Sequence, residues 1–485
     1  MINTVSEAIT YQMPVRKPTR MLSGVSVVAV MTKPYPCPHG KCIYCPGGPD
    51  KGTPQSYIGE EPALMRALRA SFDPYEQVRA RLRQYEALGQ IPSKVEVVVM
   101  GGTFTALPED YQDWFIANVF DAANRYPEPK TSHTPNVVEA QERNETARVR
   151  IVALTLETRP DLAKERQCDR MLYLGATRVE IGVQSIYDDV LALVRRGHTV
   201  RDTIEATRIL RDCGFKVGYH IMLGLPGSDP SRDLEMIREL FENPDFRPDM
   251  LKIYPTLVVP DTELYGWWKE GRYRPYSDDE VVELVSEAYR YIPSWVRIMR
   301  IQRDVPAQYI VAGPKKGNLR ELVEARALSK GIRIQEIRFR EIGRQTFYRG
   351  VSPSKIEIRK EYYEAGGGIE VFISAEDIGL GAVVGILRLR IPSDRAHRPE
   401  VRGRVAIVRE LHVYGPQVPV GEHEDRSWQH KGWGARLLRE AEEIARYEFH
   451  YSRILVLAGV GAREYYRKYG YVKLGTGPYM VKDLT

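Results

Sequence analysis

Cysteine is scarce in this chain, which has five cysteines among 485 residues. Cys168 and Cys213 stand alone in helix-like segments, so we expect both to be buried small hydrophobic side chains and expect no disulfide framework. Long apolar runs are also missing. The run VSVVAVM near the start is far shorter than the ~20 residues that cross a bilayer, and the opening residues contain no signal-like apolar core. These absences favour a cytoplasmic protein with no membrane partner.

The other three cysteines stand close together. Cys37, Cys42 and Cys45 have the spacing C-x4-C-x2-C within KPYPCPHGKCIYCPGG, where prolines and glycines favour an exposed, irregular loop. Three thiolates can hold three corners of a [4Fe–4S] cluster, although clusters usually have four cysteine ligands. The open iron can then bind S-adenosylmethionine (SAM) and pass it an electron, which produces a carbon radical. A tetrahedral zinc site that uses His39 remains the alternative.

Positive charge is unevenly distributed over the chain. The net charge is +6, but residues 314–360 contain 13 Lys and Arg against 5 Glu and no Asp. Such a segment is often only a solvated face. Together with Arg297, Arg300 and Arg303, however, it indicates a surface for a polyanion, and nucleic acid is favoured over a membrane.

Residues 25–300 alternate β-rich runs with amphipathic helical segments, which indicates an α/β fold. The expected strands are 25–31, 94–101, 150–157, 178–185, 216–224 and 250–257, and the expected helices are 61–70, 74–88, 108–125, 163–175, 200–214 and 231–242. Nearly all-apolar strands separated by helices are typical of a parallel sheet covered by helices. Six such units fit a full or partial (β/α) barrel.

Glycines and polar residues stand at the ends of these strands. Gly101 and Gly102 follow the second strand, while Glu157 and Gln184 end the next two; the cysteine loop follows the first. Reacting groups of such barrels lie at the carboxyl ends of the strands, so we expect all of these at one mouth. The bare backbone of the two glycines lets SAM approach closely, with Glu157 and Gln184 as further contacts. An ordinary turn and two rim residues are the alternatives.

The last third of the chain has a different pattern. Alternating strands from residue 372 onward, including 382–392 and 405–415, indicate an antiparallel sheet. A glycine-containing segment then leads directly into an amphipathic helix, and the free amides of such a helix start can hold a pyrophosphate. These parts in this order resemble the GNAT acetyltransferase fold, which binds acetyl-CoA. The candidate contacts are Glu410, Leu411, His412, Val413, Gln429, Gly432, Trp433, Gly434, Ala435, Tyr465 and Tyr466, although the two tyrosines can also be plain core aromatics.

A cysteine loop of this kind followed by a GNAT-like domain is a rare pairing, and the sequence resembles the Elp3 family over nearly its whole length. The resemblance lies in long stretches such as CIYCPGGPDKGTPQSYIGEEPALMRALRASFDPYEQVRARLRQYEALGQ, VVVMGGTFTALP, LTLETRPD, RVEIGVQSIYDDVL, HIMLGLPG, ELHVYG, QHKGWG and YYRKYGYV. It implies a radical SAM enzyme that adds the acetyl methyl carbon of acetyl-CoA to C5 of the wobble uridine of tRNA, giving 5-carboxymethyluridine. It also implies that Cys37, Cys42 and Cys45 hold the cluster and that Lys94 reaches acetyl-CoA from the first domain.

The expected domains are a basic tail at 1–19, a radical SAM partial barrel at 20–300, a basic linker at 301–344 and a GNAT-like α+β domain at 345–485. Members of the family often carry zinc-binding cysteines between the domains, but the corresponding run IRIQEIRFRE (332–341) has no thiol. Without thiolates a structural zinc site is disfavoured. We therefore predict no bound zinc, and apolar packing in the linker instead.

Two other functions remain open at this point. The first is a protein lysine acetyltransferase whose first half is only structural, with Glu410 as the nominal base for the incoming amine. The second is a nucleic-acid-binding scaffold without turnover. Whether accessory subunits or a second copy of the chain take part is also left open.

Overall fold

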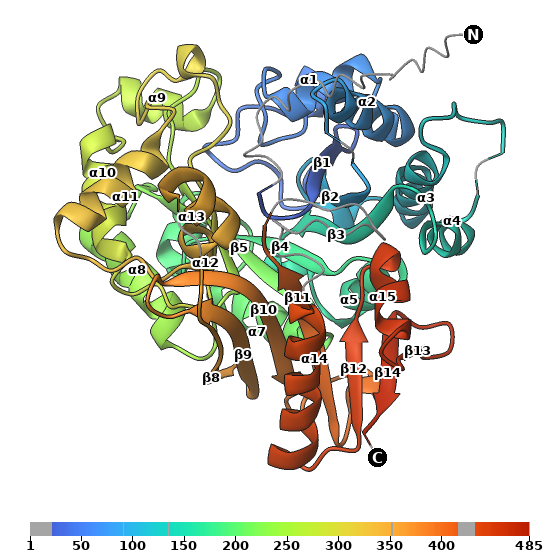
Figure 1. Ribbon diagram of the computed structural model, residues 1–485. Helices are drawn as coiled ribbons and strands as arrows, with labels where there is room; N and C mark the ends of the chain where they lie inside the picture. The colour runs from blue at the N-terminus through green and yellow to red at the C-terminus, as the bar shows by residue number, and fades with distance from the viewer. Residues whose placement is uncertain (1–21, 91, 134, 351–352, 416–431, 485) are drawn as a thin grey trace, which may run out of the picture.

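The computed structural model describes residues 22–90, 92–133, 135–350, 353–415 and 432–484, so the predicted tail at 1–19 and Gln429 lie outside the described residues. Two seven-stranded sheets organise the chain (Figure 1). Among the described residues, no helix combines the length and apolar character needed to cross a membrane.

The first sheet is entirely parallel, and its strands follow one another in sequence order. Its apolar strands are buried on both faces, as the sequence predicts for a sheet covered by helices. No pairing between the first and the last strand is seen in the described residues, so the sheet is an open half-barrel. The strands are β1 (Ser26–Met31), β2 (Lys94–Met100), β3 (Arg150–Thr158), β4 (Arg178–Gln184), β5 (Lys216–Leu223), β6 (Met250–Pro255) and β7 (Arg297–Ile301).

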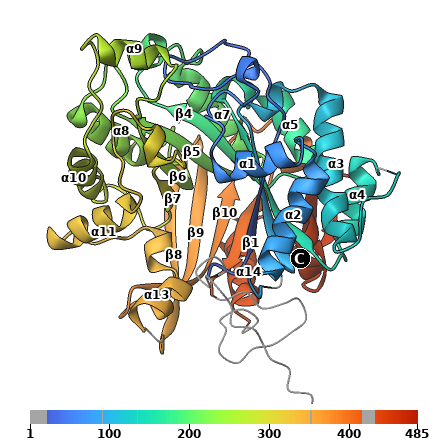
Figure 2. The same cartoon turned by 90° about the horizontal axis from the view of Figure 1, so that it is seen from above.

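Helices in the connections cover the outer face of this half-barrel (Figures 1 and 2). Several start at a side-chain cap; Asn136, Thr199 and Ser277, for example, each form a capping box with an acidic residue three positions on. The helices are α1 (Pro62–Arg69), α2 (Pro74–Glu86), α3 (Glu109–Arg125), α4 (Val137–Asn144), α5 (Glu165–Tyr173), α6 (Asp188–Leu193), α7 (Val200–Asp212), α8 (Pro230–Glu242), α9 (Glu263–Lys269) and α10 (Asp278–Ala288).

The expectation of a partial barrel is confirmed, but the sequence pattern missed its last strand. In β7, Arg297 and Arg300 alternate with the buried Ile298 and Ile301, and the arginines hide the strand pattern. The assignment of Arg297 to an exposed basic surface is wrong. Its side chain is mostly buried, and its guanidinium pairs with Glu341 at 2.6 Å.

The predicted basic linker is folded and packed. It contains α11 (Leu319–Ser329) and α12 (Ile337–Arg340), and its expected end at residue 344 falls inside α13 (Ile342–Arg349). Helix α11 lies beside α10 (Figure 2). Ile332, Ile334 and Ile337 are buried in the main core, so the segment without thiols is indeed held by apolar packing. Much of its positive charge is also matched by intramolecular ion pairs, such as Lys330 with Glu287 at 2.7 Å. The segment is therefore not the continuous free basic face that its composition indicates.

The second sheet is mixed, whereas the sequence pattern predicts an antiparallel one. Its order is β13-β14-β12-β11-β10-β9-β8, and the β11–β12 pair is parallel because α14 connects these two strands. The elements are β8 (Ile356–Ala365), β9 (Gly368–Asp377), β10 (Ala382–Ile391), β11 (Val405–Val413), α14 (Trp433–Glu443), a π-helical turn (Ile444–Glu448), β12 (Arg453–Leu457), α15 (Arg463–Arg467), β13 (Val472–Lys473) and β14 (Tyr479–Asp483).

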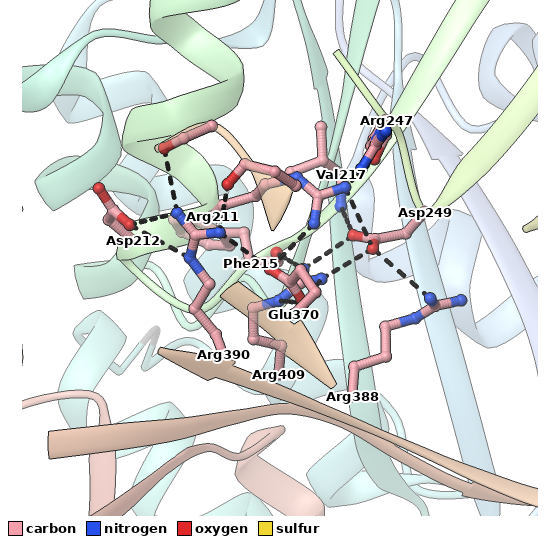
Figure 3. A network of polar contacts seen from close by, with 12 residues as sticks. Arg211, Asp212, Phe215, Val217, Arg247, Asp249, Glu370, Arg388, Arg390 and Arg409 are labelled. Carbon is pink, nitrogen blue, oxygen red and sulfur yellow. Dashed lines mark hydrogen bonds and ion pairs between the residues drawn. The ribbon is translucent and has the colours of Figure 1, made fainter. Parts of the chain in front are cut away.

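The two sheets are joined by a buried network of charges (Figure 3). Arg409 of β11 makes a two-pronged contact with Asp249, just before β6, at 2.7 and 2.8 Å. Arg390 of β10 reaches Asp212 at the end of α7 at 2.7 Å. All four side chains are almost completely buried. Because each charge has an opposite partner, the network fixes the second sheet against the first without leaving an unpaired buried ion.

Close backbone contact reinforces this interface. A Cβ atom added at Gly459 would lie 1.9 Å from the Val152 carbonyl oxygen of β3, and one at Gly461 would lie 2.6 Å from the Arg150 Cβ. Only glycine lets the loop after β12 approach the half-barrel this closely. The interface therefore depends on backbone shape as well as on charge.

Candidate active site

The cysteine loop lies beyond the carboxyl end of β1 and, as predicted, is irregular over residues 32–47. Gln55 holds it in shape, because its Oε1 accepts from the Cys37 amide at 2.6 Å and its Nε2 donates to the Gly40 carbonyl at 3.1 Å. Cys42 and Cys45 are buried and Cys37 is half-buried. The loop thus presents three thiols on a backbone fixed from within.

The three thiols of the loop do not form a compact group of ligands for one metal ion. Within the described residues, the groups of three ligand atoms that all lie within 4.8 Å of one another do not include Cys37, Cys42 and Cys45. His39 Nε2 is 3.2 Å from Cys42 Sγ but does not complete such a group. Three thiols that do not close around a single ion fit the corners of a cluster better than a zinc site, so the donor set favours the [4Fe–4S] interpretation.

One arginine stabilises negative charge at this loop. Arg196 Nη1 lies 3.9 Å from Cys42 Sγ, and its Nη2 donates to the Gly182 carbonyl at 2.8 Å. A hydrogen bond with Cys45 and then the charge of Arg196 lower the pKa of Cys42 to about 6. A Cβ at Gly182 would lie 2.4 Å from Arg196 Nη2, so glycine makes room for this cation. Arg196 is a site residue that sequence reasoning missed.

The strand ends named from the sequence gather at the same mouth. Gly102, Glu157 and Gln184 line one cavity together with the three cysteines. Gly101 lies behind it, where a Cβ would meet the Thr32 side chain at 2.2 Å. The structure therefore brings together residues from four strand ends of the half-barrel, as the barrel argument predicts.

Several polar atoms in this cavity are buried without a partner in the described structure. They include Gln184 Oε1 and Arg159 Nη1. Gln184 also has a φ of 67°, a left-handed conformation that is strained for glutamine. Unsatisfied buried groups and local strain are typical of a binding site. These donors and acceptors fit the amino, carboxylate and ribose groups of SAM.

A layer of charged side chains lies inside the half-barrel below this cavity. Glu180 of β4 is 1% exposed and contacts His220 Nε2 at 2.8 Å and Arg178 at 3.2 Å, and it also pairs with Lys252. Burial disfavours charge here, yet Lys252 and Arg178 hold the pKa of Glu180 well below its usual value. We call this set the central ion-pair layer: Glu96, Glu157, Arg178, Glu180, His220 and Lys252.

Sequence analysis recovered only Glu157 of this layer. The available signal was a charged residue inside an otherwise apolar parallel strand, as with Glu180 in RVEIGVQ and Lys252 in MLKIYP. Such residues are costly in a barrel interior unless they are paired across strands. Only the assembled sheet shows the pairing.

A second, larger cavity of about 1090 Å³ lies between the half-barrel and the second sheet. Of the predicted acetyl-CoA contacts, the residues in its lining are Lys94, Glu410, Leu411, His412, Val413, Gly432, Gly434, Ala435, Tyr465 and Tyr466. Trp433 is not in the lining; its ring lies 4.2 Å from the Arg436 guanidinium. The predicted acetyl-CoA contact from the first domain, Lys94, therefore faces the same cavity as the predicted contacts from the second domain.

The start of α14 opens onto this cavity. Gly432 precedes the helix with a φ of 80°, and no side-chain cap of the first turn is found among the described residues. A Cβ at Gly434 would lie 2.4 Å from Tyr465 Oη, so the tyrosine approaches the helix start because residue 434 has no side chain. Uncapped amides at a helix N-terminus suit a phosphate group.

The lining of this cavity is rich in arginine and lysine. Burial and then the charges of Arg320 and Arg297 lower the pKa of Arg338, and the Arg338 Nε is buried without a partner. Burial also lowers the pKa of Lys94 to about 8. Crowded cations of this kind favour an anionic ligand, which would offset their repulsion.

Glu410 is poorly suited to act as a base. Its Oε2 accepts from Arg388 Nε at 2.7 Å, and both side chains are buried. Burial opposes its charge, but Arg388 and Lys216 keep the pKa of Glu410 below its usual value. A carboxylate held in an ion pair with a lowered pKa has little tendency to take a proton from an amine.

Comparison with known families agrees with this two-part site. The family model "Radical SAM superfamily" matches residues 33–240, "Radical_SAM C-terminal domain" matches residues 248–328, and "Acetyltransferase (GNAT) family" matches residues 337–471. The first match contains the cysteine loop and its cavity. The last contains β11, α14 and the tyrosines of the second cavity.

Similar proteins are known over nearly the full length. The chain is 50% identical to the tRNA uridine(34) acetyltransferase of Methanocaldococcus jannaschii over 97% of this chain and 86% of that protein. It is 48% identical to Elongator complex protein 3 of Homo sapiens over 96% of this chain and 86% of that protein. The structure of Methanocaldococcus infernus Elp3 with an N-terminal deletion matches 95% of this chain and 100% of that one, with 46% identity and a TM-score of 0.83. This chain therefore belongs to the Elp3 family, with a radical SAM half-barrel followed by a GNAT-like domain.

Proposed function

We propose that this chain modifies uridine 34 of tRNA by adding the methyl carbon of acetyl-CoA to C5 of the base, which gives 5-carboxymethyluridine. Its relatives named for tRNA uridine(34) support the substrate. The cysteine loop and the acetyltransferase match support the two cofactors. When bound, the cluster and SAM supply a radical able to remove hydrogen from an unactivated methyl group.

One observation carries the proposal: the two cavities lie at opposite ends of the same strands. The cluster-side cavity is lined by residues at or near strand ends, including Met100, Thr158, Gln184, Met222 and Tyr254. The second cavity is lined by the first residues of six strands, namely Lys94, Arg150, Arg178, Lys216, Met250 and Arg297. Along β4 the central ion-pair layer separates the two cavities. Glu180 lines the cluster-side cavity, and Arg178, two residues earlier, lines the second cavity.

The residues of the chain divide the work accordingly. Cys37, Cys42 and Cys45 would hold the cluster, while Gly102, Glu157, Gln184 and Arg159 would orient SAM above it. Lys94, the α14 start and the two tyrosines would hold acetyl-CoA, with its acetyl end directed into the half-barrel. In the net reaction the methyl carbon would bond to C5, the methyl hydrogen would leave in 5′-deoxyadenosine and the C5 hydrogen as a proton, and the electron used to cleave SAM would be regained. Water then releases CoA as the thiol.

The tRNA would be held by phosphate contacts that position it without specifying its sequence. Arg300 and Arg303 line the cluster-side cavity and are placed to meet the backbone around an unstacked base. Exposed cations of the linker, such as Lys315, Lys316 and Arg333, would extend this grip. Arg297 is excluded from this role by its burial.

The test is a product assay under anaerobic conditions with reconstituted protein, SAM, acetyl-CoA deuterated in the methyl group, and tRNA. We expect 5-carboxymethyluridine and deuterium in 5′-deoxyadenosine. Cys42→Ala should abolish both and leave CoA binding unchanged, and Val472→Thr, at an exposed strand position, should act as wild type. Peptide lysine acetylation by Cys42→Ala, without any tRNA product from wild type, would favour a lysine acetyltransferase. The ion pair that holds Glu410 argues against that outcome.

A further inference from the structure

The two cysteines outside the cluster loop meet a histidine from the second domain. Cys168 lies in α5, Cys213 follows α7, and His397 lies in the loop between β10 and β11. Their ligand atoms all lie within 4.8 Å of one another, and Cys213 Sγ is 3.8 Å from His397 Nδ1. Both thiols are fully buried, and the histidine side chain is only 13% exposed. Residues separated by up to 229 positions in sequence thus form one compact group of soft donors.

The histidine is oriented for metal binding. Its Nε2 lies 2.9 Å from Asp169 Oδ1, and Arg398 holds the same carboxylate oxygen at 2.7 Å. With the proton on Nε2, the ring donates to Asp169 and directs the Nδ1 lone pair at the two sulfur atoms. A ligating histidine whose other nitrogen donates to a carboxylate is the usual arrangement in metal sites.

Distance and charge both match a zinc-class ion. In a tetrahedral zinc site, sulfur and nitrogen ligands stand about 3.6 Å apart, close to the 3.8 Å separation of Cys213 Sγ and His397 Nδ1. A divalent cation that replaces two thiol protons leaves two thiolates and an ion with no net charge, which suits a buried position. Two thiolates and an imidazole are soft ligands and select zinc over magnesium or calcium.

The other compact group of candidate ligands carries no such inference. Glu157, Glu180 and His220 also meet the distance criterion, but the Lys252 ammonium already lies between the two carboxylates. A cation is therefore built into that group. The hydrogen-bond contact described for these thiols, between Cys213 Sγ and His397 Nδ1, involves no lysine or arginine.

We propose that Cys168, Cys213 and His397 form a zinc site, with Asp169 orienting the histidine and water completing the coordination. The site joins α5 and α7 of the half-barrel to the loop before β11, beside the Arg390–Asp212 pair that links the same parts. Zinc bound there would tie the two domains together. This zinc site would contradict our expectation that the chain binds no zinc. The separate prediction that the thiol-free linker holds no zinc would remain unchanged.

The five cysteines of the chain allow a direct test. In the variant Cys37→Ser/Cys42→Ser/Cys45→Ser, Cys168 and Cys213 are the only thiols left. Titration with Co²⁺ should show one equivalent bound with thiolate-to-cobalt charge-transfer absorption, and Zn²⁺ should displace it and raise the melting temperature. Adding Cys213→Ser should abolish the absorption. Asp169→Asn should weaken binding by about 10- to 100-fold, and His450→Asn, at an exposed position, should have no effect.

Two results would overturn the proposal: no charge-transfer band in the folded triple variant, or a band that survives Cys213→Ser. Circular dichroism reports whether each variant is folded. If the triple variant does not fold, the full chain with its cluster reconstituted is loaded with Zn²⁺ and measured by zinc-edge X-ray absorption. Two sulfur neighbours per zinc are expected, and a shell made only of nitrogen and oxygen would refute the site.

Discussion

Arg178 and Glu180 pair at 3.2 Å on β4 yet line different cavities. A strand places residues two positions apart on the same face, and here that face is the interior of the half-barrel. One ion pair thus stands between the cluster-side cavity and the cavity between the two sheets. The proposed chemistry needs the acetyl methyl group and SAM to meet, so this layer has to admit or position the acetyl group.

Glu180→Gln tests the role of the central ion-pair layer. The amide keeps the shape of the side chain but removes the charge shared by Lys252, Arg178 and His220. We expect SAM cleavage and CoA binding to stay within about twofold of wild type, while deuterium transfer from the acetyl methyl group to 5′-deoxyadenosine falls at least about tenfold, because a misplaced methyl group loses the advantage of orientation. Glu263→Gln, which removes an exposed ion pair with Arg195, is the control. Unchanged deuterium transfer would show that the layer is only structural.

CoA binding should depend on pH through Lys94, whose pKa burial lowers to about 8. Below pH 8 the side chain is charged and attracts phosphate, whereas above pH 8 it is neutral. Affinity should therefore fall by up to about tenfold between pH 7 and pH 9, and binding near pH 8 should take up a proton. Burial moves the pKa of His412 down and those of Tyr465 and Tyr466 up, so these groups do not titrate in this range.

Isothermal titration calorimetry in buffers of different ionisation enthalpy measures both effects. Lys94→Arg should keep the affinity and lose the pH dependence, because arginine stays charged. Lys94→Gln should bind weakly at pH 7 and show no proton uptake. A Lys94→Gln variant with the wild-type pH profile would assign the dependence to another group.

Arg409→Met should destabilise the whole molecule. The variant leaves Asp249 and Glu370 buried with fewer opposite charges, and breaking a buried pair from one side costs about 3–5 kcal/mol. Urea denaturation with Lys51→Met as the control measures this, since the exposed Lys51–Asp261 pair contributes at most about 1 kcal/mol. If both variants lose the same free energy of unfolding, the network in Figure 3 does not hold the domains together.

Gly434→Ala should weaken CoA binding by about tenfold or more, because the new methyl group would displace Tyr465 from the α14 start. Gly266→Ala is the matched control, since a Cβ at that helical position meets nothing within 4 Å. The measurement is the equilibrium binding of CoA to each variant, after their melting temperatures have shown that the two variants are equally stable. If both variants bind CoA like wild type, the close approach of Tyr465 to α14 has no part in the site.

The sequence alone determined the parallel half-barrel, the cysteine loop and the order of strands and helix along the second domain. These are local properties: apolar runs of strand length, glycines and prolines at fixed positions, and a helix that begins just after Gly432. Long matched stretches also identified the family. None of this requires knowing which distant residues meet.

The tertiary structure alone decided which charges are paired and which donors converge. The sequence cannot show that Arg297 is buried against Glu341, or that Glu180 shares Lys252 with Glu157. For the same reason Cys168 and Cys213 pass as plain hydrophobic residues until His397 from the second domain lies beside them. The energy of a charge or a thiol depends on partners that only the packing of the two sheets supplies, and those partners come from positions up to hundreds of residues away.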